Sequence, residues 1–118
     1  MHTNTKAVIL GASIEQFSFV SKYLSAWECF NVPLNVSGEM SALNHQKPDL
    51  IILYARKECV DTVFVCENIR RVAELSNVPL LLVISRYQMD QAHAIKDIVN
   101  ANYIIAPFSE AELQNKTP

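Results

Sequence analysis

Short apolar runs return at regular intervals along this chain, and stretches with helical periodicity separate them. Runs of this length and composition are typical of strands buried on both faces of a sheet. Such strands, alternating with helices, predict a parallel sheet covered by helices on both sides. The runs that we interpret as strands are Lys6–Leu10, Asn31–Val36, Leu50–Leu53, Pro79–Ile84 and Tyr103–Ile105.

Two of the intervening helices have clear start signals. Ser13-Ile-Glu-Gln16 and Ser109-Glu-Ala-Glu112 both match the capping box, in which side chains at the first turn satisfy backbone N–H groups. After the first box, apolar residues recur every three or four positions and predict one buried helix face. That face consists of Phe17, Val20, Leu24 and Trp27.

Weaker patterns predict the other helices. Glu39–Gln46 reads as a short helix, and Gln88–Val99 as a longer one with Ala92, Ile95 and Val99 facing inward. Another helix buries Val65, Ile69 and Val72, and we expect Arg70 and Arg71 on its exposed face.

Pro33 decides the place of the second strand in the sheet. Proline cannot donate to a strand ladder, so we expect this strand at a sheet edge. The strand order 2-1-3-4-5 places it there. The prediction is a flavodoxin-like, doubly wound α/β fold with five parallel strands.

Composition excludes several classes of function. A chain of 118 residues with a net charge of −2 forms one domain and has no general attraction to nucleic acid or anionic membranes. No apolar run approaches the roughly 20 residues of a membrane helix. We therefore expect a cytoplasmic protein with reduced cysteines and no cofactor. We also expect no metal site, since the cysteines and histidines have no metal-ligand spacing. They are Cys29, Cys59, Cys66, His2, His45 and His93.

Three segments resemble the receiver domain of bacterial two-component response regulators. They are Lys47-Pro-Asp-Leu-Ile-Ile-Leu53, Val78-Pro79 and Tyr103-Ile-Ile-Ala-Pro-Phe-Ser-Glu-Ala-Glu-Leu113. The last resembles the family's aromatic switch, Lys-Pro-Phe and helix-start segment, which makes Tyr103 the switch aromatic. The resemblance implies the CheY-like fold, a phosphorelay context and a cis peptide bond at Ala106–Pro107.

The positions that hold metal and phosphate in receivers differ in this chain. Gly11 and Ala12 stand where the family has an acidic pair, and Tyr54 stands where it has the phosphorylated Asp. Phosphoryl transfer needs an acceptor oxygen, and Mg²⁺ needs hard oxygen ligands. Aspartyl phosphorylation by the family mechanism is therefore excluded. Tyr54 as acceptor, and Glu15 or Glu58 as a metal ligand, remain as alternatives.

Two further family positions have also changed. Ile84 aligns with the Thr or Ser that contacts the phosphoryl group, and Ser85 follows it. Ala106 replaces the conserved family Lys. The resemblance thus implies a degenerate receiver without catalytic residues.

Two interpretations of the altered pocket stay open. In one, the Tyr54 ring fills the volume that the small residues vacate, and no site remains. In the other, a reshaped pocket beside Tyr54 binds a small ligand, or Arg56, Lys57 and Arg86 bind an anion or an acidic partner segment.

A second candidate surface is the one that receivers use for dimerisation or output. It would include His93, Lys96, Asp97, Tyr103 and Glu110.

We interpret the chain as a pseudo-receiver, not an enzyme, that acts through protein–protein contacts. Its partner would be a second copy, an output domain on the same polypeptide or another signalling protein. We expect the chain to be one domain excised from a longer protein, with a small-ligand or anion sensor as the alternative function.

Overall fold

The computed structural model describes residues 5–33, 45–55 and 62–118. Five strands form one parallel sheet in the order β2-β1-β3-β4-β5, as predicted. The strands are β1 (Lys6–Leu10), β2 (Glu28–Val32), β3 (Leu50–Tyr54), β4 (Leu80–Ile84) and β5 (Ala101–Ile105). The fold is the flavodoxin-like α/β fold of CheY-like proteins.

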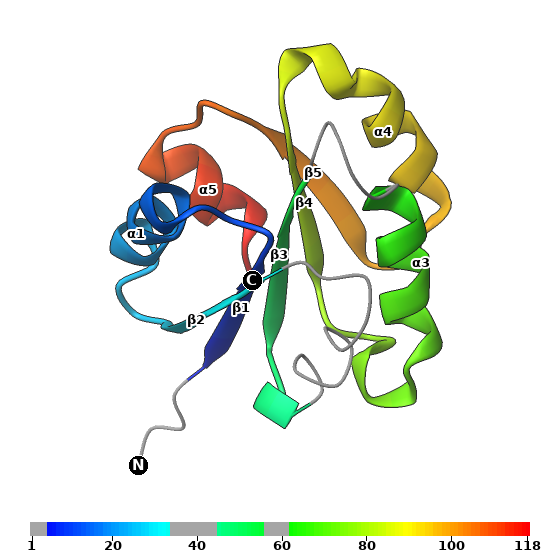
Figure 1. Ribbon diagram of the computed structural model, residues 1–118, viewed down its shortest axis with the longest axis horizontal. Coiled ribbons are helices and arrows are strands. Elements are labelled where there is room, and N and C mark those ends of the chain that lie inside the picture. The colour runs from blue at the N-terminus through cyan, green and yellow to red at the C-terminus, as the bar shows by residue number, and fades with distance from the viewer. Residues whose placement is uncertain (1–4, 34–44, 56–61) are drawn as a thin grey trace.

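Helices cover both faces of the sheet. They are α1 (Ile14–Tyr23), α3 (Thr62–Arg71), α4 (Met89–Ala94) and α5 (Glu110–Lys116), with 3₁₀ turns η1 (Ala73–Leu75), η2 (Arg86–Gln88) and η3 (Ile95–Asp97). Figure 1 shows α1 and α5 on one face and α3 and α4 on the other. In the described part of the chain, no helix is long and apolar enough to cross a membrane.

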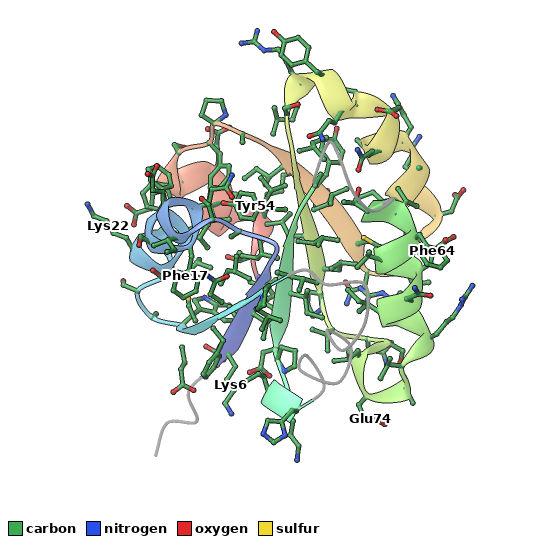
Figure 2. All side chains as sticks on the ribbon, viewed as in Figure 1. Lys6, Phe17, Lys22, Tyr54, Phe64 and Glu74 are labelled. Atoms are coloured by element: carbon green, nitrogen blue, oxygen red, sulfur yellow. The ribbon has the colours of Figure 1, made fainter. Side chains whose placement is uncertain are left out.

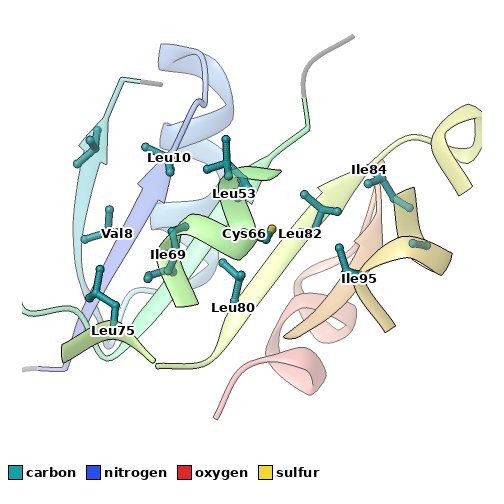
Figure 3. Packing of buried hydrophobic residues seen from close by; sticks show 14 residues of the cluster. Val8, Leu10, Leu53, Cys66, Ile69, Leu75, Leu80, Leu82, Ile84 and Ile95 are labelled. Atoms are coloured by element: carbon teal, nitrogen blue, oxygen red, sulfur yellow. The ribbon is translucent and has the colours of Figure 1, made fainter. Parts of the chain in front are cut away.

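Successive strand residues point to opposite faces and build two cores. Val8 and Leu10 of β1 lie in the core under α3 and α4, which Figure 3 shows, whereas Ala7 and Ile9 lie in the core under α1 and α5. Every residue of β3 and β4 is buried. This is why their sequences are continuously apolar instead of alternating.

Both predicted capping boxes are confirmed. The Gln16 N–H donates to Ser13 Oγ at 3.1 Å, and the Ser13 N–H donates to Gln16 Oε1 at 2.8 Å. Ser109 and Glu112 make the equivalent pair at the start of α5. These bonds satisfy donors that the first helical turn otherwise leaves without partners.

The second strand was predicted too far along the chain. It lies at the sheet edge as expected, but it runs from Glu28 to Val32, so Pro33 follows this strand and does not interrupt it. Residues 34–36 of the predicted range lie outside the described residues. Val32 pairs with Leu10, and its carbonyl accepts from the Gly11 N–H at 3.0 Å. Gly11 then turns the chain out of the strand with φ 78°.

Two helix predictions were too long. α1 ends at Tyr23, and Trp27 packs on the core from the following turn. α4 ends at Ala94, where the chain tightens into η3 and becomes extended at Ile98, so the helical period no longer applies. Ala92 and Ile95 are buried as predicted, but Val99 is 70% exposed.

The remaining differences are local. α3 ends at Arg71, one residue before Val72, and Arg70 is half-buried instead of exposed because it bonds to neighbouring loops. Of the predicted helix Glu39–Gln46, only His45 and Gln46 are described, and both are helical. Cys66 is buried and Cys29 half-buried, whereas Cys59 and His2 lie outside the described residues.

Candidate functional site

The carboxyl ends of the strands bring most of the predicted site positions together. The Ala55 N–H donates to the Val83 carbonyl at 2.9 Å, and the Ala106 N–H donates to the Ile84 carbonyl at 2.7 Å. Ligands of open α/β sheets bind at this end. The Ala106–Pro107 peptide bond is cis, as the family resemblance predicted.

Tyr54 is the central side chain at this end of the sheet. It is 7% exposed and belongs to the core under α1 and α5, with Ala12 and Ala106 packed against the same core. Figure 2 shows Tyr54 on the side of the sheet that α1 and α5 cover. Burial raises the pKa of its phenol to about 12, because the charged tyrosinate is disfavoured away from water. Tyr54 is therefore neutral at physiological pH.

A hollow of about 270 Å³ lies beside Tyr54, and we refer to it as the aromatic hollow. Its rings come from three elements: Phe19 from α1, Tyr54 from β3, and Phe108 from the segment between β5 and α5. Glu15, Gln16, Ala106 and Pro107 complete the lining. A pocket beside Tyr54 was predicted under one interpretation of the sequence, but Phe19 and Phe108 were not predicted to line it.

Ile84 and Ser85 serve the fold at this end of the sheet. Ile84 is 1% exposed, and its side chain lies in the core under α3 and α4. Ser85 begins η2: its Oγ accepts from the Tyr87 N–H at 3.3 Å, and its own N–H donates to Gln88 Oε1 at 2.8 Å. This is a third capping box and the second with the S-x-x-Q pattern; it was not predicted, although the pattern is readable in the sequence.

The predicted cations do not gather at the aromatic hollow within the described residues. Arg86 is exposed, and its guanidinium carbon lies 5.8 Å from the centre of the Tyr87 ring instead of lining the hollow. Arg56 and Lys57 lie outside the described residues. The geometry of the described part therefore gives no anion site of the kind that these three residues would form.

The described residues place one carboxylate beside Tyr54 in the aromatic hollow. Glu15 lines the aromatic hollow, and Glu58 lies outside the described residues. Among residues 5–33, 45–55 and 62–118, no three His, Cys, Asp or Glu side chains are grouped as a metal site.

The second predicted surface lies around edge strand β5. His93 of α4, Lys96 and Asp97 of η3, and Glu110 of α5 are exposed. Tyr103 is half-buried: it packs on the core under α3 and α4, and Lys116 Nζ lies 5.5 Å from its ring centre. We refer to these five predicted residues as the β5 face.

Comparison with known proteins identifies structural neighbours. The chain matches no protein-family model and no curated protein sequence. One similar solved structure is chemotaxis protein CheY4 of Vibrio cholerae, with 15% identity, a TM-score of 0.79 and coverage of 96% of this chain and 95% of that chain. The N-terminal domain of the nisin resistance regulator NsrR has 19% identity, a TM-score of 0.80 and coverage of 97% of this chain and 95% of that chain. A receiver-modulated diguanylate cyclase from Pelobacter carbinolicus has 21% identity, a TM-score of 0.70 and coverage of 95% of this chain and 87% of that chain. These neighbours are response-regulator proteins or receiver domains, and at such identities the likeness shows the fold.

Proposed function

We propose that this chain is a receiver-like signalling domain that acts through protein–protein contacts and does not accept a phosphoryl group. Its structural neighbours are receiver domains, which supports a role in signal transduction. One neighbour's name joins a receiver to a diguanylate cyclase, and another is an N-terminal domain. By analogy, the partner is an output domain on the same polypeptide, a second copy or another signalling protein.

The observation that carries the proposal is the nature of the residue at the end of β3. Tyr54 is a buried, neutral phenol, whereas a receiver needs an ionised carboxylate there as acceptor and metal ligand. The neighbouring positions Gly11, Ala12 and Ala106 supply neither a carboxylate for Mg²⁺ nor a cation for the phosphoryl charge. The domain therefore acts without enzymatic chemistry.

The proposed contact surface is the β5 face. β5 is an edge strand, and exposed charges of both signs flank it on η3 and α5. Charges on the rim of an interface set the partner and its register more than they set affinity. Because the switch of phosphorylatable receivers needs the missing acceptor, we propose that partner binding sets the conformation of Tyr103. A few kcal/mol of differential binding is enough to bias such a two-state element.

The loss of the phosphate switch is tested by amide NMR of the whole chain. Mg²⁺ is added first, followed by beryllofluoride, which stands in for the phosphoryl group. We expect no saturable shift at Gly11, Tyr54 or Ser85, and a receiver with the complete acidic set, titrated in parallel, serves as the positive control. Localised saturable shifts at these three residues would refute the proposal, because some other oxygen ligands would then hold the metal.

The contact surface is tested by sedimentation velocity over a range of concentrations, alone and with candidate output domains. We expect self-association or complex formation that is indifferent to Mg²⁺ and phosphodonor. Asp97→Lys should weaken that association, whereas the matched control Asp90→Lys on α4, outside the β5 face, should not. Equal effects of the two charge reversals would refute the β5 face as the contact surface.

A further inference from the structure

The aromatic hollow holds a half-exposed ring that the hydrophobic core does not explain. Phe19 is 48% exposed, although core packing favours burial of a side chain of this size. Its position is nevertheless defined. The ring centre lies 4.4 Å from that of Tyr23 and 6.4 Å from that of Phe108, with the Phe108 ring nearly perpendicular to it. A fixed ring at the rim leaves its open face toward the hollow or solvent.

The charge of the described lining is negative. Glu15 is the one Asp or Glu among the described lining residues, Tyr54 is neutral, and the other lining residues are Gln16, Phe19, Ala106, Pro107 and Phe108. No Lys, Arg or His is among the described lining residues.

The backbone N–H groups of the same lining offer little to an anion. The Ala106 N–H is already bonded to the Ile84 carbonyl, and Pro107 has no N–H. The positive end of the α1 dipole lies nearby, but the Ser13 cap already accepts the Gln16 N–H, and Glu15 lies in the first turn, where it offsets that charge. Gln16 Nε2 and the neutral Tyr54 hydroxyl remain as possible donors, so the described lining disfavours an anion through the charge of Glu15 and not through a lack of donors.

We propose that the aromatic hollow binds a small organic cation with an aromatic body. Aromatic faces attract cations through their quadrupole, and a nearby carboxylate adds a direct charge interaction. The volume of about 270 Å³ equals roughly nine water molecules of liquid. This is enough for a single ring with a short ammonium arm.

This inference goes beyond the proposed function and does not depend on it. The ligand bridges α1, the end of β3 and the segment before α5, so its binding would stabilise their arrangement by mass action. The site would give the domain an input that requires neither Mg²⁺ nor a phosphoryl group. The beryllofluoride titration therefore tests the proposed function separately from this site.

The test is an amide NMR titration of the whole chain with three probes of matched size. They are 2-phenylethylammonium, the neutral 2-phenylethanol and the anionic phenylacetate. We expect saturable shifts at Glu15, Phe19 and Phe108 with the ammonium. Its affinity should exceed that of the alcohol by about fivefold, the scale of an exposed cation–π contact with an added charge pair. Phenylacetate should not saturate.

Variants assign the selectivity to the hollow. Glu15→Gln should reduce ammonium affinity about twofold, because it removes the charge pair and leaves the cation–π contact, while the matched control Glu28→Gln on β2 should leave it unchanged. Phe19→Leu should weaken both ligands, because it removes a ring that each of them contacts.

Three results would overturn the inference. They are no saturable shift with any probe, equal affinity for ammonium and alcohol, and tighter binding of phenylacetate. N-acetyl-lysine methylamide serves as a fourth probe, because a partner protein's lysine carries the same ammonium group. Tighter binding of this probe than of 2-phenylethylammonium would assign the hollow to a protein side chain and refute a small-molecule ligand.

Discussion

Arg70 joins three segments of the chain through backbone carbonyls. Its Nε donates to the Val99 carbonyl at 2.7 Å, its Nη1 to the Leu75 carbonyl at 2.8 Å and its Nη2 to the Asn100 carbonyl at 3.0 Å. Partial burial lowers the pKa of the guanidinium, which nevertheless stays protonated. One side chain of α3 thus anchors η1 and the connection from η3 to β5.

Arg70→Ala removes all three hydrogen bonds. The bond to Leu75 is partly buried, and its loss should cost about 1.5 kcal/mol. The other two lie at exposed sites where water replaces the donor, so we expect roughly 0.5 kcal/mol for each. The free energy of unfolding should therefore fall by about 2–3 kcal/mol. For a domain of this size, that lowers Tm by roughly 8–12 °C.

The neighbouring Arg71 provides a matched control. It is exposed, and its Nη1 donates to Asn68 Oδ1 at 3.2 Å, so Arg71→Ala should change stability by less than about 0.5 kcal/mol. Arg70→Lys should destabilise the fold by more than half as much as Arg70→Ala, because an ammonium cannot reproduce the planar fork. Urea unfolding followed by circular dichroism measures all three variants. Equal stability of Arg70→Ala and Arg71→Ala would refute the stabilising role of the three Arg70 hydrogen bonds.

Three further perturbations follow from the described contacts. The pKa of Tyr54 in the folded protein is about 12, above its ordinary value of 10.0. The neutral phenol therefore stabilises the fold below about pH 10, and this stabilisation is lost as the pH rises toward about 12. Tyr54→Phe should remove this part of the alkaline decline in unfolding free energy, and an unchanged pH profile would contradict the burial of the phenol. Ser109→Ala removes the α5 cap and should cost about 1 kcal/mol, whereas Ser18→Ala within α1 should cost nothing; equal thermal shifts would argue against the cap. Thr62→Val removes the hydroxyl that donates to Gln91 and should lower the free energy of unfolding by about 1–2 kcal/mol. In a double-mutant cycle, the second change Gln91→Leu should restore part of this loss, and simple additivity of the two changes would show that the pair is not coupled.

Local signals in the sequence were enough to predict the architecture. Continuous apolar runs identified β3 and β4 as strands buried on both faces, and the S-x-x-Q and S-x-x-E patterns identified the starts of α1 and α5. These predictions succeeded because side-chain burial in a parallel strand and hydrogen bonding in a first helical turn depend on residues close together in the chain. The strand order also followed, since Pro33 pointed to an edge even though the strand ends before it.

Element ends and long-range contacts could not be predicted in the same way. Val99 keeps the helical spacing, yet η3 breaks the helix before it. Nothing near Arg70 in the sequence shows that carbonyls about 30 residues further on lie within its reach. Both depend on how segments far apart in the sequence pack together.

In the candidate site, too, some features could be predicted from the sequence and others depend on tertiary packing. The sequence by itself determined its chemistry, since Gly11, Ala12, Tyr54 and Ala106 stand at the ends of strands whatever the detailed packing. Only the tertiary structure decided that Arg86 lies against Tyr87 and away from the aromatic hollow, and that Phe19 and Phe108 stand beside Tyr54. The identity of a residue determines whether its side chain can ionise or donate a hydrogen bond. The neighbours of that side chain come from separate helices and strands, so the packing of these elements against the sheet determines the shape and charge of the space between them.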